Sequence, residues 1–325
     1  MSTVGLVTGV MSMKRTKYPI HPDFKKWENM NPPLNRTIVL VIQRIMGLLF
    51  MWEKSTAELT VDRKIISVGN GDTIRALWYC PKNAGEEAPC LVYYHGGGFV
   101  FPASPHHYSL AKEYAQRACC KVLFVDYRLA PKYPFPIAPE DCYAAYSWVH
   151  AHAGELSIDP NRIAVAGDSA GGQLATVVCL MAKERGQVMP CSQMLIYPAV
   201  GNVETESAKR YTDTPMCNSR DMEKYGKLYR PDPFVGKNIY ASPIEAESLE
   251  GLPAAYIETA EFDCLRDGGI LYGERLQQFG VSSELYNTKG TMHGFDIVLD
   301  SQIVRGCVNR RITFLRREFA ARHMV

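Results

Sequence analysis

The stretch Gly167-Asp168-Ser169-Ala170-Gly171-Gly172 contains the pattern G-x-S-x-G. This spacing presents a serine on a sharp turn between a strand and a helix, with its hydroxyl exposed at the edge of a sheet. Glycines two positions before and after the serine let backbone segments approach where a side chain would clash. The flanking residues fit a turn between a strand and a helix, because residues 162–166 predict a short buried strand and residues 173–182 predict a helix. We therefore expect Ser169 to be a nucleophile and Asp168 to make a structural hydrogen bond.

The rest of the chain predicts an α/β fold around this turn. Two strands at 60–68 and 73–79 are joined by Asn70-Gly71-Asp72, which is a hairpin signal. Further strands are expected at 90–94, 121–125, 194–197, 254–258 and 283–286, and helices at about 107–119, 139–152, 267–279 and 301–322. Strands that alternate with helices form a mostly parallel sheet with helices on both faces, and the hairpin adds an antiparallel edge.

Two segments stand apart from this alternation. Residues 1–58 contain several prolines and one apolar helix, which is expected to begin near Arg36 with Asn35 as its N-cap. Residues 200–240 are polar and proline-containing. We expect both segments to form a cap over a catalytic domain at 59–325. The apolar stretch 38–52 is shorter than the roughly 20 residues that span a bilayer, so we expect it to pack on the protein rather than insert stably into a membrane.

Composition excludes several classes of protein. The 325 residues are 46% hydrophobic and 22% charged, as in ordinary globular proteins. A net charge of +2 gives no reason to expect a nucleic-acid partner. The ten cysteines form no C-x-x-C pair, so no metal site is expected, and we predict free thiols in a cytoplasmic, reducing compartment.

A serine hydroxyl is a weak nucleophile that needs a neighbouring base. Of the eight histidines, His293 is the best candidate, because it lies just past the last predicted strand. Loops at the carboxyl ends of the strands form the active edge of such a sheet, and the chain order is serine, then acid, then histidine. We therefore expect His293 to be the base of Ser169.

Four carboxylates fall in the interval where the acid is expected: Glu258, Glu261, Asp263 and Asp267. Asp263 follows the predicted strand after a short loop and lies 30 residues before His293. Asp267 is better placed to cap the next helix. The acid would hold the tautomer of the imidazole and stabilise the imidazolium. The order of residues favours Asp263 and leaves Asp267 as the alternative.

The sequence His95-Gly96-Gly97-Gly98 has the form of an oxyanion-hole loop. Three glycines allow a bent loop whose backbone N–H groups point into a pocket, and the N–H of Ala170 would complete the set of donors. His95 is expected to brace the loop rather than transfer protons. A phosphate-binding loop is rejected, because no Lys-Ser/Thr pair follows.

Five motifs occur in one order: HGGGF at 95–99, DYRLAPKYPFP at 126–136, GDSAGG at 167–172, FDCLRD at 262–267 and MHGF at 292–295. Over residues 60–320, the chain resembles the hormone-sensitive-lipase-like family of α/β-hydrolases, which includes bacterial acetyl esterases and carboxylesterases. One departure is Cys264, which stands where the family often has proline.

The resemblance implies an α/β-hydrolase fold with a mobile helical cap. It implies a triad of Ser169, Asp263 and His293, which strengthens the choice of Asp263. It also implies that Gly97, Gly98 and Ala170 provide the oxyanion donors: their supporting residues are His95, Gly96 and Asp168.

The function expected from these motifs is hydrolysis of short-chain, acetyl-like carboxylic esters through an acyl-serine, without a metal or cofactor. An amidase that acts on arylamides or formamides with the same triad is the first alternative. A non-catalytic small-molecule receptor is the second, and the presence of His293 argues against it. The last helix and an edge strand could pair two copies of the chain in a homodimer.

Overall fold

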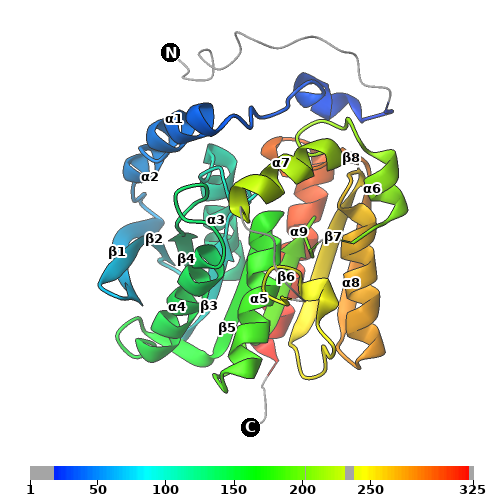
Figure 1. Cartoon of the computed structure of the whole chain (residues 1–325). Coiled ribbons are helices and arrows are strands. Elements are labelled where there is room, and N and C mark those ends of the chain that lie inside the picture. Colours follow the sequence, from blue (N-terminus) through cyan, green and yellow to red (C-terminus); the bar gives the residue numbers. More distant parts are fainter. Residues whose placement is uncertain (1–17, 202, 231–237, 322–325) are drawn as a thin grey trace.

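The computed structural model describes residues 18–201, 203–230 and 238–321. Predictions for residues 1–17, 202 and 231–237 of the cap segments, and for position 322 of the last helix, lie outside these residues. The strands are β1 Leu59–Gly69, β2 Asp72–Pro81, β3 Ala88–Tyr94, β4 Lys121–Asp126, β5 Ile158–Asp168, β6 Ser192–Ile196, β7 Ala254–Phe262 and β8 Ser283–Met292. They form one eight-stranded sheet in the order β1-β2-β4-β3-β5-β6-β7-β8 (Figure 1).

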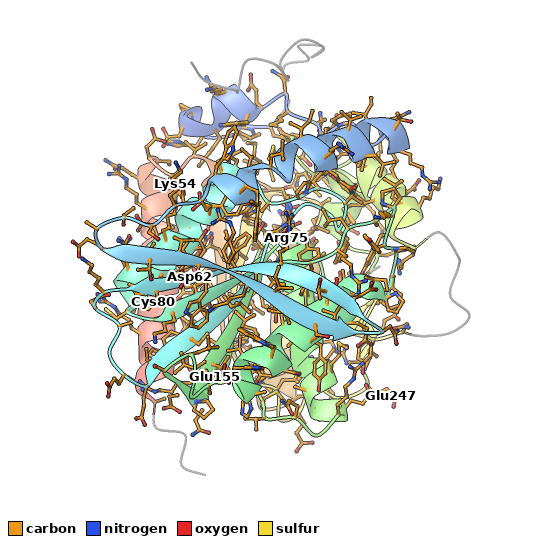
Figure 2. All side chains as sticks on the ribbon, turned by 90° about the vertical axis from the view of Figure 1, so that its left-hand side faces the viewer. Lys54, Asp62, Arg75, Cys80, Glu155 and Glu247 are labelled. Atoms are coloured by element: carbon orange, nitrogen blue, oxygen red, sulfur yellow. The ribbon has the colours of Figure 1, made fainter. Side chains whose placement is uncertain are left out.

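The hairpin at the edge of the sheet is antiparallel, as predicted. β1 pairs with β2, and β2 pairs with β4, both in antiparallel fashion, whereas every pair from β4 to β8 is parallel. Asn70 and Gly71 form the turn with phi angles of 52° and 78°, which the residues Asn-Gly favour. Figure 2 looks onto this edge, where Arg75 pairs with Asp126 of β4 at 2.5 Å.

Helices cover both faces of the sheet. They are α1 Arg36–Met46, α2 Leu49–Trp52, α3 Pro105–Ala118, α4 Ile137–Ala151, α5 Ala170–Glu184, α6 Glu206–Arg210, α7 Ser219–Tyr229, α8 Arg266–Gln278 and α9 Gln302–Ala320. Helices α4, α5 and α8 lie on one face, and α3 and α9 on the other (Figure 1). The predicted α/β class and the two-sided covering are confirmed.

Strand β3 shows why helices cover both faces of the sheet. Its side chains alternate between the two faces, as the period of a strand requires. Leu91 and Tyr93 join the core formed with α3 and α9. Val92 and Tyr94 join the core formed with α4, α5 and α8. Because both faces are buried, this strand is a continuous apolar run in the sequence.

The N-terminal apolar stretch is two helices rather than one. Asn35 caps α1, and its Oδ1 accepts hydrogen bonds from the N–H groups of Thr37 and Ile38. Helix α1 ends at Met46 and α2 begins at Leu49, so the expectation of one apolar helix in this segment is wrong. Glycine is a poor helix residue because it loses the most backbone freedom on ordering. In the described part of the chain, no helix combines the length and apolar character needed to cross a membrane.

Helices α1 and α7 lie above the carboxyl-end edge of the parallel strands (Figure 1). Helix α7 begins with a cap by Asn218, whose side chain accepts from the N–H of Asp221. Gly98, in the loop after β3, lies against Tyr225 of α7, where an added Cβ would come within 2.4 Å of the ring. The two segments therefore meet the edge of the sheet where the predicted site residues lie.

Candidate active site

Ser169 occupies the turn between β5 and α5 in a strained conformation, with phi of 54° and psi of −118°. A residue with a side chain adopts positive phi at a cost, and such strain gathers at functional sites. The neighbouring glycines are required by packing. A Cβ at Gly167 would lie 2.2 Å from the carbonyl oxygen of Gly171, and one at Gly171 would lie 1.9 Å from that of Tyr94. The close approach predicted from the spacing is present.

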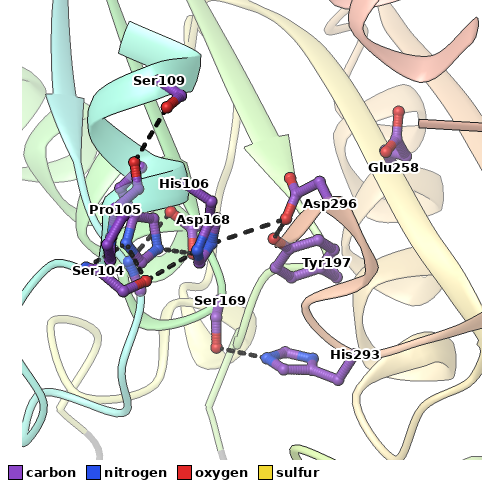
Figure 3. A network of polar contacts seen from close by, with 12 residues as sticks. Ser104, Pro105, His106, Ser109, Asp168, Ser169, Tyr197, Glu258, His293 and Asp296 are labelled. Carbon is purple, nitrogen blue, oxygen red and sulfur yellow. Dashed lines mark hydrogen bonds and ion pairs between the residues drawn. The ribbon is translucent and has the colours of Figure 1, made fainter. Parts of the chain in front are cut away.

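The structure brings Ser169, His293 and Asp263 together. Nε2 of His293 lies 2.8 Å from Oγ of Ser169, and a dashed line marks this contact in Figure 3. Nδ1 of the same ring lies 2.7 Å from Oδ2 of Asp263. The carboxylate can only accept, so Nδ1 carries the proton and Nε2 accepts from the serine hydroxyl. The three residues come from the turn after β5 and the loops after β7 and β8, at one edge of the sheet.

Asp263 and His293 are buried, which makes their contact electrostatically strong. Oδ1 of Asp263 also accepts from the N–H of Leu265 at 2.9 Å, which fixes the orientation of the carboxylate. Burial alone would lower the pKa of His293, but the charge and hydrogen bond of Asp263 outweigh it and raise this pKa above 6.5. The arrangement can accept a proton from Ser169 and stabilise the resulting imidazolium.

The other predicted carboxylates have separate partners. Glu258 is fully buried and contacts Arg311 at 2.5 Å. Glu261 accepts from the N–H of Gly290 at 2.7 Å. Asp267 does not cap α8, because the residue at that position is Leu265; instead its Oδ2 accepts from the N–H of Ser207 at 2.7 Å. The expectation of a cap is therefore wrong, and the reason is a long-range contact with α6.

The glycine loop after β3 is shaped by contacts that exclude side chains. Gly97 has phi of 113°, and an added Cβ there would lie 2.5 Å from the carbonyl oxygen of Phe101. Gly98 also has positive phi, at 62°. Within the described residues, the N–H groups of Gly97, Gly98 and Ala170 have no hydrogen-bond acceptor. All three residues line the same cleft as Ser169, so their donors are available to a ligand.

Asp168 supports the loop from beneath. Its Oδ1 accepts from the hydroxyl of Tyr93 at 2.9 Å and from the N–H of Gly96 at 3.0 Å. Its Oδ2 lies 3.1 Å from Nε2 of His107. Although burial acts to raise the pKa of Asp168, His107 lowers it well below its usual value. Asp168 is therefore an ionised hydrogen-bond acceptor that does not take part in proton transfer near neutral pH.

His95 is buried and stays neutral. Its Nδ1 lies 2.7 Å from the carbonyl oxygen of Gly96, and its ring stacks on Tyr127 with centroids 4.4 Å apart. Burial and, to a smaller extent, the nearby His107 lower the pKa of His95 to about 4. These contacts fit the bracing position that we expected for this histidine.

A buried ionic network beside the site has no motif in the sequence, and Figure 3 shows two of its carboxylates, Glu258 and Asp296. Arg311 of α9 pairs with Glu258 of β7 and, at 2.9 Å, with Asp296. Asp296 also accepts a hydrogen bond from the hydroxyl of Tyr197, whose ring lies 4.8 Å from that of His293. The acidic character of Asp296 three residues after His293 was the only local signal. The network connects α9 with the loop that carries His293.

A cleft of about 1560 Å³ opens onto Ser169 and His293. Its walls include Ile42 and Met46 of α1 and Met222 of α7. Apolar walls with a few convergent polar groups are typical of sites for small organic molecules.

Comparisons with known proteins agree with this geometry. A family model described as the α/β-hydrolase fold matches residues 91–297. Esterase LipI of Mycobacterium tuberculosis is 36% identical over 247 residues, covering 75% of this chain and 75% of that protein. Ethyl acetate hydrolase of Pseudomonas putida is 34% identical over 234 residues, covering 71% of this chain and 74% of that protein. A solved bacterial heroin esterase has a TM-score of 0.84 and 33% identity, covering 93% of this chain and 99% of that one.

The fold and these matches define the class of protein first: this chain is a member of the α/β-hydrolase family. Within that family, it belongs to the hormone-sensitive-lipase-like carboxylesterases, as the five ordered motifs predict.

Proposed function

We propose that this chain is a serine carboxylesterase with Ser169 as nucleophile, His293 as general base and Asp263 as the acid that orients the base. The observation that carries the proposal is the continuous contact from Oγ of Ser169 through the imidazole to Oδ2 of Asp263, with distances of 2.8 and 2.7 Å. Relatives named esterase and carboxylic ester hydrolase support hydrolysis of ester bonds. The substrate is therefore a small-molecule ester.

The reaction begins when His293 takes the proton of Ser169 and Oγ attacks the ester carbonyl carbon. The carbonyl oxygen becomes an oxyanion, and the N–H groups of Gly97, Gly98 and Ala170 donate hydrogen bonds to it. Each such donor contributes about 3–4 kcal/mol to the stability of the transition state. His293 then gives its proton to the departing alkoxide, which leaves an acyl group on Ser169.

The second half of the reaction releases the acid. A water molecule transfers a proton to Nε2 of His293 and attacks the acyl carbon. Collapse of this second intermediate breaks the bond to Oγ, and His293 returns the proton to Ser169. None of these steps uses a metal or an organic cofactor.

Residues 1–58 and about 200–240 act, in this proposal, as a cap that bounds the substrate cleft. Support comes from the positions of α1 and α7, and from cleft walls that include Ile42 and Met222. We propose short acyl groups, in keeping with a relative named ethyl acetate hydrolase. The volume of about 1560 Å³ leaves room for an alcohol portion much larger than ethyl.

The test is a panel of p-nitrophenyl esters of increasing acyl length, run beside the matching anilides. We expect ester turnover that is greatest for short acyl groups and is abolished by Ser169→Ala. Dominant anilide turnover would identify an amidase instead. Tight binding of a small molecule without turnover of either series would identify a receptor.

Two further expectations belong to this proposal. The ten cysteines are free thiols, which supports a cytoplasmic location. A homodimer through α9 and the edge strand β8 is the oligomeric state that belongs to this proposal. Light scattering of the purified chain measures its mass and so decides between monomer and dimer.

A further inference from the structure

Three sulfur atoms gather in the wall of the catalytic cleft. Sγ of Cys217 lies 3.7 Å from Sγ of Cys264 and 3.5 Å from Sδ of Met222. Cys217 precedes the cap residue of α7, Met222 lies in the first turns of that helix, and Cys264 directly follows Asp263. The sulfur cluster, made of Cys217, Met222 and Cys264, therefore joins a segment of the proposed cap to the loop of the catalytic acid.

The spacing of the two thiols fits a shared metal ion. Two thiolates held at about 2.3 Å from one ion, with tetrahedral angles, lie about 3.8 Å apart. The observed 3.7 Å is close to this value, whereas a disulfide requires a separation of about 2.05 Å. A carboxylate oxygen of Asp263 lies within 4.8 Å of both thiol sulfurs. The cluster thus offers two thiols, a thioether and a nearby carboxylate.

We propose that Cys217, Met222 and Cys264 bind one soft d10 metal ion, of the Zn²⁺, Cd²⁺ or Cu⁺ type, beside the catalytic acid. Thiolate and thioether ligands select such ions over hard cations. All three residues line the cleft, so an ion that enters it reaches the sulfur atoms. The two cysteines are 47 residues apart, so the sequence contains no ligand spacing that would reveal the site.

Binding requires both thiols to lose their protons. Each M–S bond then forms from a thiolate lone pair, and two protons pass to solvent for each ion bound. Because protons are released when the ion binds, affinity increases as pH rises.

Occupancy of the cluster has a consequence for the proposed function. Asp263 needs Oδ2 for His293 and Oδ1 for the N–H of Leu265. A cation at the sulfur cluster draws this carboxylate toward itself and so competes with His293 for it. The ion therefore inhibits ester hydrolysis, and its removal by a chelator restores the activity. This second effect rests on the proposed function, whereas binding does not.

The test titrates the full chain with Cd²⁺ under reducing conditions and follows the ultraviolet thiolate-to-cadmium charge-transfer absorption. We expect one ion per chain in the high-affinity phase. We expect the affinity for Cd²⁺ to fall by more than about 100-fold in Cys217→Ser and in Cys264→Ser. This loss is larger than the loss caused by removing a residue that only contacts a metal ligand. Cys119→Ser is the matched control, since this exposed thiol lies outside the cluster, and it keeps the affinity of the original chain. Circular dichroism checks that each variant is folded.

Esterase assays in the same titration distinguish metal binding at the sulfur cluster from its effect on Asp263. Inhibition that follows occupancy and is reversed by a chelator supports the link to Asp263. If the chain gives the charge-transfer signal with Cd²⁺ but has no esterase activity without metal, the metal site is supported and the proposed function is contradicted. Unchanged Cd²⁺ affinity in both folded serine variants overturns the site. Loss of activity that a chelator does not reverse contradicts the link to Asp263.

Discussion

Gln43 of α1 donates hydrogen bonds from Nε2 to the carbonyl oxygens of Val100 and Ala130, both at 2.7 Å. Val100 lies two residues after Gly98, so this contact fixes α1 beside the glycine loop. Gln43→Leu keeps the size of the side chain but leaves both carbonyl groups without this donor. A loss of about 1 kcal/mol in cap docking would raise KM about fivefold, with a smaller change in kcat. Steady-state kinetics measures KM and kcat separately, and Arg44→Ala, at an exposed position of the same helix, is the control. Equal KM values for Gln43→Leu and Arg44→Ala would contradict the anchoring of α1 by Gln43.

The acid is tested by comparing two neighbouring aspartates. Asp263→Asn removes the acceptor that holds the tautomer of His293, and we expect kcat to fall by about 10⁴-fold. Asp267→Asn weakens contacts with Ser207 and Arg266, so it reduces thermal stability with little effect on kcat. Kinetics and thermal denaturation of both variants separate these effects. Loss of activity in the second variant alone would assign the acid to Asp267.

The pH dependence follows from the neutral form of His293, which is the base. Asp263 raises the pKa of this histidine despite its burial, so a larger part of the enzyme is protonated and inactive at a given mildly acidic pH. We therefore expect kcat/KM to rise with pH and reach half its maximum above 6.5. A pH profile with a p-nitrophenyl ester measures this limb. A midpoint at or below the ordinary histidine value would contradict the paired arrangement.

Arg311 is predicted to be essential for stability. It is fully buried and pairs with Glu258 and Asp296. Arg311→Met leaves two buried carboxylates without their cation, which costs about 3–5 kcal/mol of unfolding free energy. Exposed Arg305→Met in the same helix serves as the control, with a change of less than about 0.5 kcal/mol expected. Urea denaturation measures both, and similar stabilities of the two variants would contradict the importance of the network.

The sequence predicts those parts of the fold and candidate site that depend on local patterns. The turn at Ser169 and the glycine loop at 95–98 need small residues at fixed spacing, so their motifs are visible directly. Buried strands such as β3 are apolar on both faces and are equally visible. Edge strand β8 is longer than expected, because the polar residues Asn287 and Thr288 end the apolar run while still pairing with β7.

Long-range partnerships were not predictable in this way. Asp267 has the composition of a helix cap, but a contact with Ser207, 60 residues away, decides its position. Arg311 and Glu258 are 53 residues apart, and nothing in either local sequence marks them as buried partners. The sequence pattern does not predict the break between α1 and α2 at Gly47, because hydrophobic residues continue on both sides of this glycine.

The proposed reaction depends on covalent acylation of Ser169. Rapid acid quenching during turnover of p-nitrophenyl acetate, followed by peptide mass spectrometry, tests it most directly. We predict an acetyl group on the peptide that contains Ser169, and its loss in Ser169→Ala together with turnover. Undiminished hydrolysis by Ser169→Ala, or an acetyl group trapped at a different residue that is required for turnover, would show that Ser169 is not the nucleophile.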